Sequence, residues 1–103
     1  MPTIFVTAPP EAAESIAQRL VEERLAACVN RFPCRSTYRW DGEIHDEEEA
    51  ILLVKTTEGG CEAVKERIEE LHPYDVPAIE RFDSSGVSPA FADWLDEAVD
   101  PPA

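Results

Sequence analysis

The chain of 103 residues has few cations and only four glycines. Nine lysines and arginines face 22 aspartates and glutamates, so the formal net charge at pH 7 is −13. Nucleic acids and anionic membranes are bound by clustered cations, so this balance argues against both as main partners. No apolar run approaches the roughly 18 residues of a membrane span, and the first residues lack the basic and apolar regions of a signal peptide. We therefore expect a cytoplasmic protein.

Common catalytic and metal-binding motifs are also missing. The glycines form neither a G-x-G-x-x-G pattern nor a phosphate-binding loop, and there is no G-x-S-x-G nucleophile motif. The three cysteines, Cys28, Cys34 and Cys61, contain no C-x-x-C pair, and an odd number cannot all pair within the chain. We expect reduced thiols, no disulfide or zinc framework, and no enzymatic activity.

The hydrophobic pattern predicts a single α+β domain over residues 1–103, with a frayed tail from 98 to 103. Asp41-Gly42 predicts a hairpin turn, since both residue types accept a positive φ. The predicted elements are a strand at 3–7, a helix opened by Pro9-Pro10, extended segments at 28–33 and 36–40, a strand from 43 towards 57, a helix from 61 to 71, a strand at 77–82 and a helix opened by Ser88 and Pro89. This β-α-β-β-α-β order plus a C-terminal helix is that of a split β-α-β, ferredoxin-like fold.

The central strands carry apolar residues on both faces. Ile51 and Leu53 point to one face while Leu52 and Val54 point to the other, although the two helices of this architecture cover only one face of the sheet. The C-terminal helix could cover the second face, but a second copy of the chain is the more economical solution. The pattern alone thus predicts a homo-oligomer.

Two groups of side chains could bind a metal ion. His45, Glu47 and Glu49 share one face of a strand and offer nitrogen and oxygen ligands, although a charged run beside a hairpin is more often a solvated strand end. Thiolates with imidazole favour copper(I) or zinc, and the available donors match no compact metal site: Cys28, Cys34, Cys61 and His72. We expect Cys28 and Cys61 to be buried structural thiols and Cys34 to be exposed.

Two loops could bind a small ligand. Gly59-Gly60 opens a helix and could present N–H groups to an anion, but a simple strand-to-helix break is the favoured interpretation. The segment His72–Pro77 places an imidazole, a phenol and a carboxylate on a turn bracketed by two prolines. It is either a rigid connection or the wall of a pocket.

Four motifs together make the chain similar to a known family. They are LVEERLAACVN at 20–30, STYRWDG at 36–42, LLVKT at 52–56 and HPYDVP at 72–77. In this order and spacing the chain resembles the CutA divalent-cation tolerance family from about Phe5 to Leu95. The resemblance implies a ferredoxin-like subunit in a tight homotrimer and tolerance of copper and other divalent cations. It implies no settled catalytic activity.

The resemblance also implies a cleft at the subunit interface. Its residues here would be Cys28, Tyr38, Trp40, Lys55, His72 and Tyr74. In one hypothesis the trimer responds to metal, and Cys28 and His72 bind copper or another divalent cation. In the alternative it is a module for small ligands or proteins, like the PII-type signalling proteins that the family's trimers resemble, and metal is incidental. There Lys55 would attract an anion while Trp40 and Tyr74 stack or pack. A scaffold without a ligand is the third possibility.

The excess of acid suggests adaptation to high salt. At about 1 M salt the Debye length falls to about 3 Å, and such a surface no longer repels itself strongly. We expect the melting temperature, followed by calorimetry, to rise markedly between about 0.1 M and about 1 M sodium chloride. A flat profile would contradict this adaptation.

Overall fold

A computed structural model describes residues 1–100, which form one antiparallel sheet and three helices. In chain order the elements are β1 (Pro2–Ala8), α1 (Pro10–Glu22), β2 (Cys28–Trp40), β3 (Glu43–Lys55), α2 (Cys61–Leu71), β4 (Ile79–Asp83) and α3 (Pro89–Ala98). The strand order is β2-β3-β1-β4. This confirms the predicted ferredoxin-like α+β class. No helix within residues 1–100 is long and apolar enough to cross a membrane.

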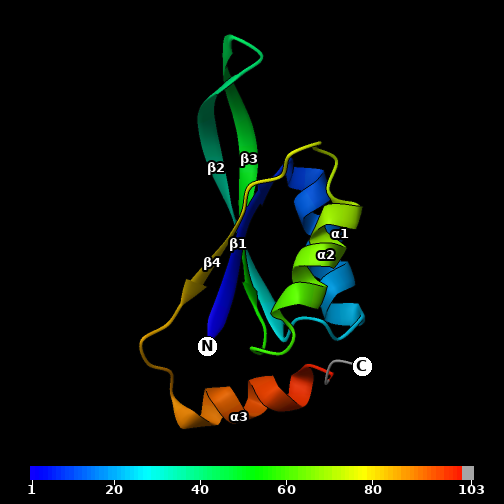
Figure 1. The fold of residues 1–103 in the computed structure, drawn as a ribbon, viewed down its shortest axis with the longest axis vertical. Helices are drawn as coiled ribbons and strands as arrows, with labels where there is room; N and C mark the ends of the chain where they lie inside the picture. The colour runs from blue at the N-terminus through cyan, green and yellow to red at the C-terminus, as the bar shows by residue number, and fades with distance from the viewer. Residues whose placement is uncertain (101–103) are drawn as a thin grey trace.

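The core lies between one face of the sheet and the helices α1 and α2, which run side by side over it (Figure 1). Ile4 and Val6 of β1 and Leu52 and Val54 of β3 have no exposed surface on this face. The apolar stripes of the two helices meet them, with Ala13, Ile16, Ala17 and Leu20 from α1 and Cys61, Val64 and Ile68 from α2. Burial of each isoleucine, leucine or valine side chain in this set contributes about 1.5–3 kcal/mol.

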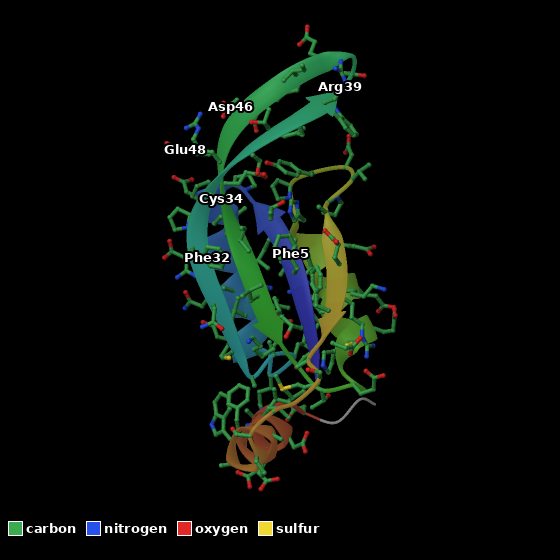
Figure 2. All side chains as sticks on the ribbon, turned by 90° about the vertical axis from the view of Figure 1, so that its left-hand side faces the viewer. Phe5, Phe32, Cys34, Arg39, Asp46 and Glu48 are labelled. Atoms are coloured by element: carbon green, nitrogen blue, oxygen red, sulfur yellow. The ribbon has the colours of Figure 1, made fainter. Side chains whose placement is uncertain are left out.

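The opposite face of the sheet, called the open face below, carries the apolar side chains that alternate with those of the core. Phe5, Ile51 and Leu53 are half-buried there, while Phe32 is 44% and Phe82 is 52% exposed. Figure 2 looks onto this face and shows Phe5 and Phe32 on it. Within residues 1–100 the open face is thus an apolar surface without a covering helix.

Helix α3 lies across one end of the sheet instead (Figure 1). Its Leu95 and the following Val99 pack with Ala27 in a small second core. The C-terminal helix therefore does not cover the open face. Covering by this helix was one of the two predicted possibilities, and it is wrong. Asp100 forms an ion pair with Arg24 at 2.9 Å. The tail predicted to fray from residue 98 is thus packed as far as Asp100, and residues 101–103 lie outside the described part of the chain.

The hairpin of β2 and β3 extends well beyond the two helices (Figure 1). Asp41 and Gly42 have φ values of 54° and 77° at its tip, as a type I′ turn requires, so the predicted turn is confirmed. The two extended segments predicted around Pro33 are one continuous strand. β2 is an edge strand, and such a strand tolerates proline because alternate N–H groups face solvent.

Element boundaries differ slightly from the prediction at the end of β3 and at the start of β4. β3 ends at Lys55 rather than near Thr57, because the buried Thr56 hydroxyl turns away to donate to the Leu25 carbonyl at 2.8 Å. β4 begins at Ile79 rather than Pro77, which has no N–H for a ladder bond. Ser88 and Pro89 occupy the predicted N-cap and first position of α3, but the Ser88 side chain makes no capping bond.

Candidate functional site

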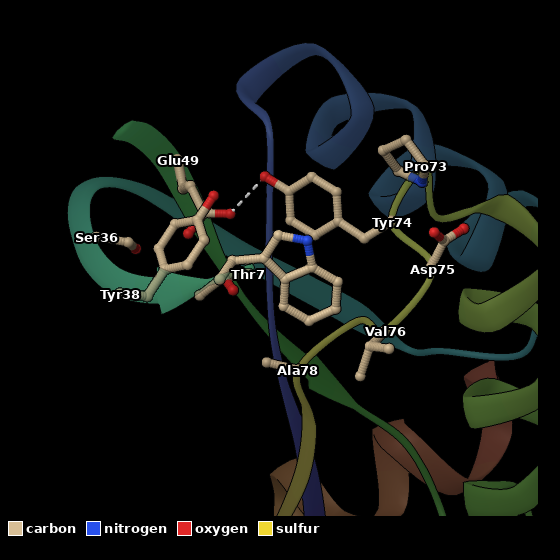
Figure 3. A pocket seen from close by; sticks show the side chains of 10 residues that line it. Thr7, Ser36, Tyr38, Glu49, Pro73, Tyr74, Asp75, Val76 and Ala78 are labelled. Carbon is tan, nitrogen blue, oxygen red and sulfur yellow. Dashed lines mark hydrogen bonds between the residues drawn. The ribbon is translucent and has the colours of Figure 1, made fainter. Parts of the chain in front are cut away.

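A cleft of about 540 Å³ lies between the β2–β3 hairpin, the end of β1 and the loop after α2 (Figure 3). This volume is typical of small-molecule sites. We call it the aromatic cleft, and it is lined by Thr7, Ser36, Tyr38, Trp40, Glu49, Pro73, Tyr74, Asp75, Val76 and Ala78. The structure thus brings together Tyr38, Trp40 and Tyr74, three of the six residues proposed from the family resemblance.

His72 anchors the loop that forms one wall of this cleft. Its imidazole is 7% exposed, its Nε2–H donates to the Thr7 carbonyl at 2.8 Å, and its Nδ1 accepts the Tyr74 N–H at 3.1 Å. Both ring nitrogens are therefore engaged with the backbone, in the neutral tautomer that carries its proton on Nε2. His72 lies beneath the loop as a positioning residue, while Pro73–Val76 face the cleft.

Tyr74 is held against the sheet by Glu49. Its hydroxyl donates to Glu49 Oε2 at 2.9 Å (Figure 3), and Glu49 is only 4% exposed. Burial, reinforced by this hydrogen bond, raises the pKa of Tyr74 far above its ordinary value. The phenol stays protonated at neutral pH and acts as a fixed donor.

A second tyrosine is held in the same way on the hairpin. The Tyr38 hydroxyl donates to Glu47 at 3.0 Å, and this hydrogen bond raises the pKa of Tyr38. The Tyr38 ring stacks on His45 with 5.3 Å between ring centroids. Trp40, at the end of β2, is 50% exposed. The hairpin thus presents aromatic surface to the cleft.

Lys55 lies far from the aromatic cleft. It pairs with Cys28 of β2 and Thr3 of β1 at the end of β3, whereas Glu49 lies at the middle of that strand, about 20 Å away. The predicted use of Lys55 to attract an anion beside Trp40 and Tyr74 therefore does not fit a single subunit.

Cys28 and His72 do not meet within one chain. Cys28 is level with Thr3, whereas His72 bonds to Thr7. Four residues of extended strand separate these levels by about 13 Å. A cation bound by both side chains would have to lie between two subunits.

The other predicted metal ligands form no cluster of three or more His, Cys, Asp or Glu within residues 1–100. His45 is engaged with Tyr38, its Nδ1 lying 3.9 Å from Glu47. Cys61 is 4% exposed in the α2 stripe, as predicted, and its burial raises the pKa of its thiol. Cys28 was predicted to be buried and Cys34 to be exposed, and both are half-buried.

Gly59-Gly60 is a strand-to-helix break. The Gly60 N–H already donates to Thr57, 3.0 Å from its Oγ1 and 3.1 Å from its carbonyl oxygen. The favoured interpretation of this loop therefore agrees with the structure, and the anion site does not.

Sequence reasoning missed Glu49 as a residue of the cleft. A signal was present, because Glu49 shares its face of β3 with Ile51 and Leu53. A carboxylate in register with an apolar face requires a specific partner, and that partner, Tyr74, comes from a loop 25 residues away.

Comparison with known proteins identifies the family. A family model described as CutA1 divalent ion tolerance protein matches residues 3–98. The chain belongs to the CutA1 family. A CutA divalent-cation tolerance protein from Thermus thermophilus is 47% identical over 96 residues, covering 91% of this chain and 93% of that protein.

Solved CutA1 structures share the whole fold. CutA1 from Pyrococcus horikoshii superimposes with a TM-score of 0.93 at 42% identity, over 97% of this chain and 99% of the other. A protein from Nostoc sp. PCC 7120, described as PII-like protein CutA, has a TM-score of 0.95 at 36% identity, over 99% of this chain and all of its own.

The contacts of His72 predict a structural role for it in this CutA1 chain. We expect His72→Ala to lower the free energy of unfolding by about 2–4 kcal/mol, since two backbone groups lose their partners and a cavity remains. Urea unfolding measures the loss. His45→Ala, at a less buried histidine, is the control and should cost less than about 1 kcal/mol. Equal losses for both variants would contradict the anchoring role.

Proposed function

We propose that the chain is the non-enzymatic subunit of a homotrimer. The trimer binds a small organic molecule in the aromatic cleft, and the presence of this molecule is signalled to a partner protein. The observation that supports this proposal most directly is the cleft itself, whose aromatic walls come from β2 and from the His72–Pro77 loop. The relationship to a Nostoc protein described as PII-like supports a signalling role.

The walls of the cleft are organised before any ligand arrives. Tyr38 and Tyr74 are each fixed by a hydrogen bond to a carboxylate, and His72 fixes the loop that carries Tyr74. Rigid walls reduce the entropy lost on binding. Such an arrangement favours recognition of a ligand over a purely architectural role.

The open face supports self-association. It exposes Phe32 and Phe82 beside the half-buried Phe5, Ile51 and Leu53, and covering such a surface stabilises an assembly by about 25 cal/mol per Å² of apolar area. In the proposed trimer, copies of this face meet one another. The ends of the sheet, where Cys28 and the aromatic cleft lie, are then near subunit boundaries.

Native mass spectrometry of the full chain tests the assembly. We expect a trimer for the wild type and a shift towards monomer for Phe32→Glu, because a buried carboxylate at the contact opposes association. Val21→Glu is the matched control, since Val21 is 42% exposed on α1, away from the open face, and it should remain trimeric. A wild-type monomer would contradict the proposal.

A second candidate function is binding of copper or another divalent cation between subunits. The family description names divalent ion tolerance, and Cys28 lies half-buried on the open face, where a neighbouring subunit would supply further ligands. His72 would join it only by giving up one of its two hydrogen bonds. Native mass spectra recorded with copper, zinc and calcium added test this candidate. Three tightly held ions per trimer that are lost in Cys28→Ser would favour it.

A cytoplasmic location is part of the proposal. It is supported by the three cysteines, all of which are free thiols, as is usual in a reducing compartment.

The two tryptophans allow a matched test of ligand binding. Saturation-transfer NMR against a mixture of neutral, cationic and anionic small molecules should detect binders for the wild type. Trp40→Ala should weaken their binding about tenfold or more, since an aromatic wall is lost. Trp94→Ala, at a residue of similar exposure on α3, should bind as the wild type does. Binding that ignores both substitutions would contradict the cleft as the site.

A further inference from the structure

The aromatic cleft carries acidic groups without basic ones. Among the described residues, the ten that line it include Glu49 and Asp75 but no lysine, arginine or histidine. Glu47 adds a further carboxylate beside Tyr38. Lys55 lies at the end of β3, six residues from Glu49, so the charged side chains that line the cleft are carboxylates, which disfavours an anionic ligand.

Glu49 is a buried carboxylate with little compensation. It is 4% exposed, and its hydrogen bond within residues 1–100 is the one from the Tyr74 hydroxyl to Oε2. None of the ion pairs in this part of the chain includes it. A carboxylate can accept about four hydrogen bonds, and buried charges are normally paired. Glu49 thus has the capacity to balance a positive group.

The remaining walls suit an organic cation better than a metal ion. Faces of Tyr and Trp rings attract cations through their quadrupole, but they offer no lone pairs of the kind that metal ions require. Val76 and Ala78 add aliphatic surface. An ammonium group with apolar substituents satisfies both features at once, since its charge meets the carboxylate while its methyl or methylene groups contact the rings.

We propose that the aromatic cleft selects small organic cations, namely amines or quaternary ammonium compounds with apolar substituents. This inference rests on the proposed function, because it names the ligand class of the same site.

Choline and its uncharged isostere 3,3-dimethylbutan-1-ol test the selection on the full-length protein. They have nearly the same shape, so a difference in affinity reports the charge. Titration followed by calorimetry and ligand NMR should give a dissociation constant for choline at least about tenfold below that of the isostere.

Two variants locate the charge effect. Glu49→Gln keeps the shape of the side chain and should bring choline to the affinity of the isostere. Glu48→Gln is the matched control, since Glu48 is exposed, lies on the other side of β3 and pairs with Arg35 at 3.5 Å. It should leave choline binding unchanged.

The outcomes separate the inference from the proposed function. Equal affinities for choline and the isostere, both weakened by Trp40→Ala, would overturn the cation selection and leave the cleft as a ligand site. Preference for an anionic probe such as inorganic phosphate would also overturn the inference alone. No binding of any probe, together with a trimer weakened by Glu49→Gln, would show that a neighbouring copy fills the cleft, and would overturn both.

Discussion

The two central strands of the sheet carry apolar side chains on both faces, and this constraint shapes the rest of the molecule. One set, Ile4, Val6, Leu52 and Val54, requires the two helices that cover it and builds the core. The other set lies on the open face, where Phe32 and Phe82 are 44% and 52% exposed. Because α3 is placed at the end of the sheet, the second set has no covering helix within residues 1–100.

The same alternation of side chains along β3 places a carboxylate at a position that is shielded from water. Glu49 follows the face of Ile51 and Leu53 and is buried beside the loop after α2. Tyr74 reaches it because His72 ties that loop to β1. The cleft is therefore a consequence of packing as much as of its own residues, and a change at His72 would loosen a wall that it does not itself line.

Local signals accounted for nearly all of the secondary structure. The helical stripe at Ala13–Leu20 and the Asp41-Gly42 turn are encoded by neighbouring residues, so periodicity and turn chemistry suffice to find them. Pro33 was misleading because its effect depends on whether its strand lies at the edge of the sheet, which no local window records. The C-terminal helix was predicted from its own pattern, but its position at the end of the sheet depends on contacts with Ala27.

The amino-acid sequence by itself determined the order of elements and the strands that are apolar on both faces. It also determined which aromatic residues belong to the family motifs. These features depend only on residue type and spacing along the chain. Only the tertiary structure decided which of those residues meet. It joined Tyr38, Trp40 and Tyr74 with Glu49, and it placed Lys55 and Cys28 six positions along the sheet from Glu49. The physical reason is that strand register and loop closure set distances between residues far apart in the chain, and a sequence motif carries no record of either.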